Sequence, residues 1–148
     1  MEHPLTLPHQ LGPLIVSLAY LLLYYIFMGR VAVTKRRLFK EYRERGEKFD
    51  RYFGQDRTML AIDRSQLNML EHMPPFLALL WLNAVCVSPG SATIAGGLYV
   101  AARAAYPLLV GGRLGREVRP MILLSTLPGY LVMLYFLGAL TWVVVAGG

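Results

Sequence analysis

Four long apolar runs restrict what this chain can fold into more than any other feature of its sequence. A helix rises about 1.5 Å per residue and the hydrocarbon core of a bilayer is about 30 Å thick, so an apolar helix of about 20 residues can cross it. The first and last runs meet this requirement. The second does so only when its polar approach, from about Met59, is also helical, and the third does so but contains Arg103. The runs cover residues 11–28, 73–87, 92–110 and 121–146.

These runs predict an all-α membrane protein, a single domain in which four transmembrane helices form a bundle. The apolar content of 55% is too high for an ordinary small soluble domain, which supports this fold class. In the third run, Gly97, Ala101 and Ala105 recur at four-residue spacing, which lets another helix pack closely. The expected helices cover about residues 11–39, 58–87, 92–110 and 120–146.

The basic residues predict how the helices are oriented in the membrane. Apart from Arg103, every Lys and Arg lies in residues 30–64 or 113–119, the first and third connections. Basic connections stay in the cytoplasm, so we expect both termini on the non-cytoplasmic side and, in a bacterium, insertion in the inner membrane. The net charge of +6 suits contact with anionic lipid headgroups. Nucleic acid is not an expected partner, because acidic residues such as Glu41 and Glu44 interrupt the basic stretch.

The segment from residue 39 to residue 57 is the one part of the chain with the composition of a soluble protein. Gly46 and Gly54 punctuate it, and charged side chains alternate with aromatic ones. Three structures fit this pattern: a solvated linker with interfacial aromatics, a segment lying on the membrane surface, or a segment folded over a cytoplasmic opening. Its aromatic residues are Phe39, Tyr42, Phe49, Tyr52 and Phe53.

A set of polar residues marks the start of the second apolar run. Arg64, Asn68, Glu71, His72 and Pro75 fall at i, i+4, i+7, i+8 and i+11, which places them on one face of a helix. A cation, an amide and a carboxylate at the mouth of a membrane helix must face protein or water rather than lipid. The adjacent prolines should bend this helix by removing backbone donors. We therefore take this face as the candidate functional site.

Arg103 should lie at a similar depth on the third helix, about 10 Å from its end at about 1.5 Å per residue. A buried arginine needs a partner, and Glu71 is the one carboxylate expected at that depth. A purely structural interpretation is an Arg103–Glu71 pair that joins two helices. A functional interpretation starts from the surplus of hydrogen-bond donors and positive charge. Arg64, Asn68 and Arg103 exceed what one carboxylate can satisfy, so they could bind an anionic ligand from the cytoplasm. Tyr99 and Tyr106 share the stripe of Arg103 at i, i+4 and i+7.

The sequence holds no pattern of a metal site. His72 has no spaced Cys or His partner, and the single cysteine, Cys86, lies in an apolar run where it is expected to be inert. The sequence also lacks a phosphate-binding loop, a dinucleotide-binding fingerprint and a Ser-His-Asp arrangement.

Two motifs resemble those of the MAPEG family, the membrane-associated proteins in eicosanoid and glutathione metabolism. The resemblance extends to chain length, helix number and the basic first connection. The motifs are Arg64-x-x-x-Asn68-x-x-Glu71-x-x-Pro74-Pro75-Phe76-Leu77 and, further along, Ala102-Arg103-x-x-Tyr106.

The resemblance implies a homotrimer of four-helix subunits. Glutathione, the co-substrate, would bind between subunits near the cytoplasmic side, and a lipophilic substrate would reach it from the bilayer. An arginine at the start of the 120–146 helix, matched by Arg116 or Arg119, would activate the thiol. A nearby arginine lowers the pKa of a thiol and favours the nucleophilic thiolate. The residues implied to bind glutathione are Arg37, Arg64, Asn68, Glu71, His72, Arg103 and Tyr106.

Three functions are compatible with these features. The leading one is a glutathione-dependent transferase or peroxidase that acts on lipophilic electrophiles or lipid hydroperoxides. The second is a non-catalytic membrane protein, either a trimeric scaffold or an accessory subunit of a larger complex. The third, a small multidrug exporter, is disfavoured because such proteins need a membrane carboxylate in the first helix, and residues 11–39 contain none.

Overall fold

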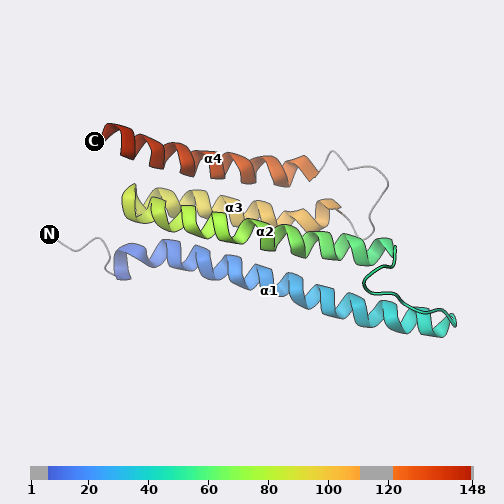
Figure 1. Ribbon diagram of the computed structural model, residues 1–148. Helices are drawn as coiled ribbons and strands as arrows, with labels where there is room; N and C mark the ends of the chain where they lie inside the picture. Colours follow the sequence, from blue (N-terminus) through green and yellow to red (C-terminus); the bar gives the residue numbers. More distant parts are fainter. Residues whose placement is uncertain (1–6, 111–121, 148) are drawn as a thin grey trace.

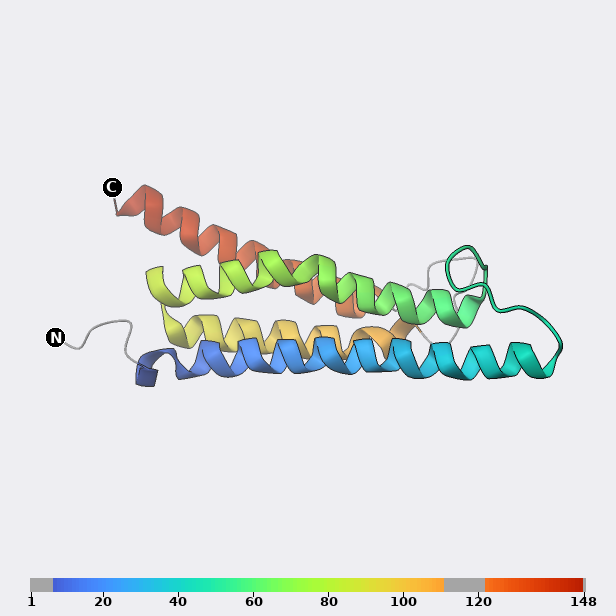
Figure 2. The same ribbon diagram turned by 60° about the horizontal axis from the view of Figure 1, so that its bottom comes forward.

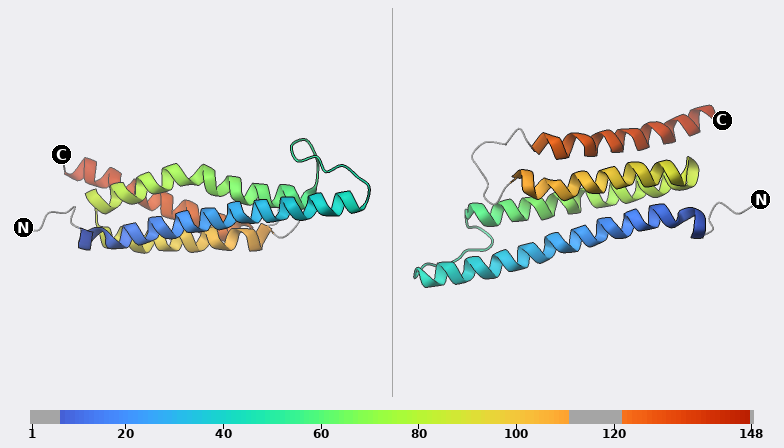
Figure 3. Two further views of the ribbon diagram at one scale, coloured as in Figure 1. Left: turned by 90° about the horizontal axis from the view of Figure 1, so that it is seen from below. Right: turned by 180° about the vertical axis from the view of Figure 1, so that it is seen from behind.

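The computed structural model describes residues 7–110 and 122–147, which form four long helices (Figure 1). Helices α2 and α3 lie in the middle, and α1 and α4 flank them on opposite sides, an arrangement also visible from behind in Figure 3. Within the described residues, α1 and α4 make no contact with each other. The helices are α1 (Leu7–Glu44), α2 (Arg57–Cys86), α3 (Pro89–Val110) and α4 (Leu123–Ala146).

The structure confirms the predicted all-α membrane bundle. Helices α1, α2 and α4 are long and apolar enough to cross a membrane. Helix α3 is not among these three, although its 22 residues span about 33 Å. The start of α1 and the end of α4 lie at one end of the bundle, and the α1–α2 connection lies at the other (Figure 1).

Helix α1 extends further than the sequence analysis predicted, to Glu44 rather than to about residue 39. Two ion pairs at i, i+4 spacing stabilise the added turn, Arg37–Glu41 at 3.4 Å and Lys40–Glu44 at 3.8 Å. The helix stops at Gly46, which has a positive φ of 73° that glycine adopts without strain.

Three aromatic rings form the centre of the bundle. Phe76 of α2 stacks on Tyr99 of α3 with ring centroids 4.1 Å apart, and Tyr20 of α1 lies 5.0 Å from Phe76. The Tyr20 hydroxyl donates a hydrogen bond of 2.7 Å to the carbonyl oxygen of Met69. A buried phenol is thereby satisfied without water, and the level of α1 against α2 is fixed.

Close helix packing occurs at Gly96 rather than at the neighbouring Gly97. A Cβ atom at Gly96 would lie 2.8 Å from both Leu80 and Val16, so α1, α2 and α3 approach one another through this position. A Cβ atom at Gly97 would meet nothing within 4 Å. Within one chain, the predicted stripe of Gly97 and Ala101 therefore faces outward, where another helix has access to it.

Candidate functional site

Arg103 is fully buried between three helices and organises the polar centre of the molecule. Its Nη1 donates a hydrogen bond of 2.6 Å to Oδ1 of Asn68, and its Nη2 lies 3.1 Å from Nδ1 of His72. Asn68 and His72 are four residues apart on α2, so they stand one above the other on the face that meets α3. The structure thus brings together three of the residues that the sequence analysis selected.

The contact with Arg103 defines the state of the His72 ring. A guanidinium only donates hydrogen bonds, so Nδ1 of His72 must accept. The imidazole is therefore neutral and carries its proton on Nε2. This leaves one N–H of His72 to serve a second acceptor.

The predicted alternative, an Arg103–Glu71 pair, is not present. Glu71 is exposed, and it forms no ion pair with any residue that the structure describes. Successive residues of a helix are offset by 100°, so Glu71 points away although it lies at the depth of Asn68 and His72. Among the residues that the structure describes, Nε of Arg103 has no hydrogen-bond partner.

Tyr99 on the same helix and two residues of α4 complete the surroundings of Arg103. The Arg103 Cζ atom lies 5.0 Å from the ring centroid of Tyr99, within the range of a cation–π contact. On α4, a Cβ atom at Gly129 would come within 3.1 Å of Arg103 Nη2, so α4 packs closely against the guanidinium here and a larger residue would require the guanidinium to shift. The next residue, Tyr130, places its ring edge-on to His72 with centroids 5.7 Å apart.

The roles of Gly129 and Tyr130 were not predicted from the sequence. Pro128 and Gly129 form a conspicuous pair inside an apolar run, which is a signal of close packing as well as of a kink. Sequence spacing relates residues within one helix, but it does not show which residue of α4 opposes which residue of α2.

Arg64 and Glu71 lie next to this buried centre, on the outer surface of α2. Both are exposed, whereas the neighbouring Asn68 and His72 are partly buried. A ligand at this surface would meet a guanidinium, a carboxylate, an amide and an imidazole N–H along a single helix face. Such a set suits a molecule that carries both carboxylate and ammonium groups.

Tyr106 lies in a different cluster, nearer the end of α3. It is buried against Ala61 of α2, with Ile122 packed beside them. In the part of the chain that the structure describes, its hydrophobic contacts hold α2 and α3 together. Its predicted role in binding glutathione receives no direct geometric support from this position.

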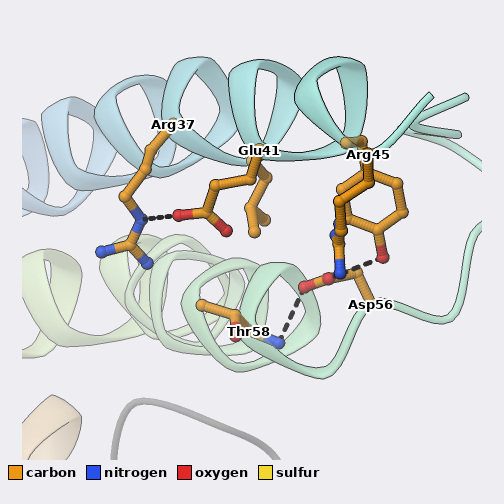
Figure 4. A pocket seen from close by; sticks show the side chains of 7 residues that line it. Arg37, Glu41, Arg45, Asp56 and Thr58 are labelled. Carbon is orange, nitrogen blue, oxygen red and sulfur yellow. Dashed lines mark hydrogen bonds and ion pairs between the residues drawn. The ribbon is translucent and has the colours of Figure 1, made fainter. Parts of the chain in front are cut away.

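Arg37 lines a pocket of about 550 Å³ between the ends of α1 and α2 (Figure 4). Its Nε pairs with Glu41, and its terminal nitrogens point toward α2 (Figure 4). At the far side of the pocket, the Tyr42 hydroxyl donates to Asp56 at 2.9 Å, and this carboxylate caps α2 through the backbone N–H groups of residues 58 and 59. The hydrogen bond to Asp56 raises the pKa of Tyr42. Arg37 therefore lines a separate, water-facing pocket rather than the surroundings of Arg103.

The predicted thiol-activating residues, Arg116 and Arg119, lie outside the described residues. Within the described ranges, no group of three or more His, Cys, Asp or Glu side chains is placed to hold a metal ion.

A sequence comparison decides the family. The MAPEG family profile matches residues 13–145, nearly the whole chain. The chain belongs to the MAPEG family. A search of curated proteins found no significant match. Membership places this MAPEG chain among the membrane proteins of glutathione and eicosanoid metabolism, and it confirms the resemblance inferred from the motifs of α2 and α3.

Proposed function

We propose that this MAPEG chain is a glutathione-dependent transferase or peroxidase that acts on lipophilic electrophiles or lipid hydroperoxides. One observation carries the proposal. Exposed Arg64 and Glu71 lie beside Asn68 and His72, which are fixed in place by a buried arginine with no carboxylate partner among the described residues. A polar face held in this way beside an apolar helix surface is suited to bind a charged thiol next to a lipid-soluble partner.

The chemistry of glutathione matches this face. The tripeptide carries two carboxylates and one ammonium group, which would meet Arg64 and Glu71 respectively, while Asn68 and His72 offer hydrogen bonds to its backbone. Charge-assisted hydrogen bonds of this kind contribute about 1.5–3 kcal/mol each. Arg37, Arg103 and Tyr106 complete the proposed binding residues, and Arg116 or Arg119 would stabilise the thiolate that attacks the electrophile.

The site is proposed to lie between the subunits of a homotrimer. Arg64 and Glu71 lie on the outside of the single chain, so a second subunit is needed to enclose a ligand there. The outward stripe of Gly97 and Ala101 offers a surface on which another helix could pack closely. The basic connections and the site would face the cytoplasm, in the inner membrane if the source is bacterial.

Calorimetric titration of glutathione into the detergent-purified protein tests the proposal. Arg64→Ala should weaken binding by about 10- to 150-fold, the equivalent of one charge-assisted hydrogen bond. Arg43→Ala is the matched control, because it removes an exposed arginine in the last turn of α1 that is not among the proposed binding residues. Equal binding by both variants would contradict the proposed site.

A second function is favoured by a different observation. Both terminal nitrogens of Arg103 already meet Asn68 and His72 of its own chain, so the polar cluster can serve to join α2 and α3 without any ligand. This arrangement fits a non-catalytic trimeric scaffold or an accessory subunit. Lack of glutathione binding by a folded trimer would select this function over the first.

A further inference from the structure

The connection between α1 and α2 folds back along α2 instead of crossing directly between the helix ends. Arg51 makes two hydrogen bonds to Asp63, at 2.8 and 2.9 Å, and Asp63 lies more than one turn inside α2. Figure 2 shows the connection curling over the first turns of α2 on the side away from α1. A bidentate Arg–carboxylate pair fixes both distance and orientation, so this position is specified rather than incidental.

A tight turn at the tip of this connection presents two aromatic side chains outward. Oδ1 of Asp50 accepts hydrogen bonds from the backbone N–H groups of Tyr52 (3.0 Å) and Phe53 (2.9 Å). A Cβ atom at Gly54 would collide with the carbonyl oxygen of Asp50, so glycine is needed for the turn to close. Tyr52 is 84% exposed and Phe53 87% exposed.

The Arg51–Asp63 pair sets the height of this tip relative to the membrane. Exposed apolar side chains of α2 lie on both sides of Asp63, at Leu60 three residues before it and at Leu67 four residues after it, the latter a rise of about 6 Å toward the apolar part of the helix. The headgroup region on each side of the hydrocarbon core is about 5–7 Å thick. Asp63, and the turn attached to it, therefore lies at the level of the lipid headgroups.

We propose that Tyr52 and Phe53 form an aromatic anchor that inserts into the headgroup region of the bilayer in which the chain resides. Aromatic rings favour this zone because their apolar faces are desolvated there while the Tyr hydroxyl stays hydrated. Exposed Arg57 at the start of α2 adds attraction to anionic headgroups. The proposed anchor corresponds to the second of the three structures expected for residues 39–57, a segment lying on the membrane surface. It is independent of the proposed glutathione site.

Spin labelling in proteoliposomes tests the anchor. The background variant Cys86→Ser removes the single cysteine, and Phe53→Cys then carries a nitroxide at the tip. The measured quantity is the ratio of collisions with oxygen, which partitions into lipid, to collisions with a water-soluble nickel chelate. This ratio should be severalfold higher for the label at residue 53 than for a label at Lys48→Cys. A label at residue 53 as accessible to nickel as the one at residue 48 would overturn the proposal. Shielding from both reagents would also overturn it, because a second copy of the chain would then cover the tip.

Breaking the Arg51–Asp63 ion pair provides a second, independent test of the anchor. Asp63→Asn should release the turn and shift the label at residue 53 toward the aqueous signature, whereas Glu44→Gln, which breaks the exposed Lys40–Glu44 pair, should leave it unchanged. An unchanged label in Asp63→Asn would contradict the assigned height. Glutathione titration of the same Asp63→Asn variant should be unaffected, so failure of the anchor is distinguishable from failure of the glutathione site.

Discussion

Arg103 keeps its charge inside the bundle through neutral partners. The sequence predicted its burial and its depth, because an arginine in an apolar run has to face protein. It did not predict the partners, since Glu71, Asn68 and His72 lie at similar depths on α2 and differ in the direction in which they point. Depth follows from counting residues, whereas direction depends on how two helices are rotated against each other.

Substitution of Gly129 should disturb this cluster from the side of α4. In Gly129→Ala the new Cβ would lie 3.1 Å from Arg103 Nη2 and would push the guanidinium away from His72. We expect the free energy of unfolding to fall by about 1–3 kcal/mol, measured by denaturation in detergent. Gly138→Ala is the control on the same helix, because its Cβ meets nothing within 4 Å. Replacement of glycine within a helix should there leave stability unchanged or raise it by up to about 1 kcal/mol. Equal loss of stability in both variants would contradict this packing.

The hydrogen bond from Tyr20 to α2 gives a second prediction at this scale. Tyr20→Phe keeps the ring in the aromatic stack and removes the donor to the Met69 carbonyl oxygen. The expected loss of stability is about 1 kcal/mol, the net value of one hydrogen bond. Tyr25→Phe, at an exposed position of the same helix, should have no effect in the same denaturation experiment.

At the scale of elements, the sequence placed the four helices correctly and misplaced some of their ends. Apolar runs report where a helix is buried, but α1 continues beyond its apolar part through ion pairs at i, i+4 spacing. The α1–α2 connection was the least predictable element, because its course depends on the Arg51–Asp63 pair between residues twelve positions apart. The start of α2 at Arg57 agrees with the prediction within one residue, and the Asp56 side chain caps it.

The contact between Tyr42 and Asp56 predicts a pH dependence of this connection. Donation to Asp56 raises the pKa of Tyr42 above its ordinary value, so the contact is fully present below the pKa of Tyr42 in the unfolded chain. It should be lost as the pH rises through the higher pKa of the folded state. The difference in phenolate absorbance between the wild type and Tyr42→Phe isolates this titration. In Asp56→Asn the same difference should appear at lower pH, and an unchanged midpoint would contradict the assignment.

At the scale of the whole molecule, two neighbouring glycines of α3 lie on different faces. Gly96 packs within the chain, and Gly97 faces outward, where another chain could pack. Periodicity predicted that α3 would use small residues for close contact. It could not tell an inner face from an outer one, since both are apolar in a membrane protein. The structure assigns Gly96 to the inner face and Gly97 to the outer face.

Paired substitutions at these glycines should have different consequences. Gly96→Val should destabilise the fold, because its side chain would overlap Leu80 and Val16. Gly97→Val should leave the helical content and thermal stability of the subunit unchanged and weaken the proposed trimer. Circular dichroism and the molecular mass in detergent distinguish the two effects. A trimer unaffected by Gly97→Val would place the subunit interface elsewhere.

The lack of contact between α1 and α4 has a consequence for how the chain assembles. Each outer helix packs only against α2 and α3, which are joined by the shortest of the described connections and so close with the smallest loss of chain entropy. Contacts between neighbours in sequence form early, and the α2–α3 hairpin is therefore the expected nucleus. Helix α1 is synthesised first, but it cannot pack in the bundle until α2 and α3 have been inserted. Helix α4 is synthesised last and can pack against α2 and α3 whether or not α1 is in place.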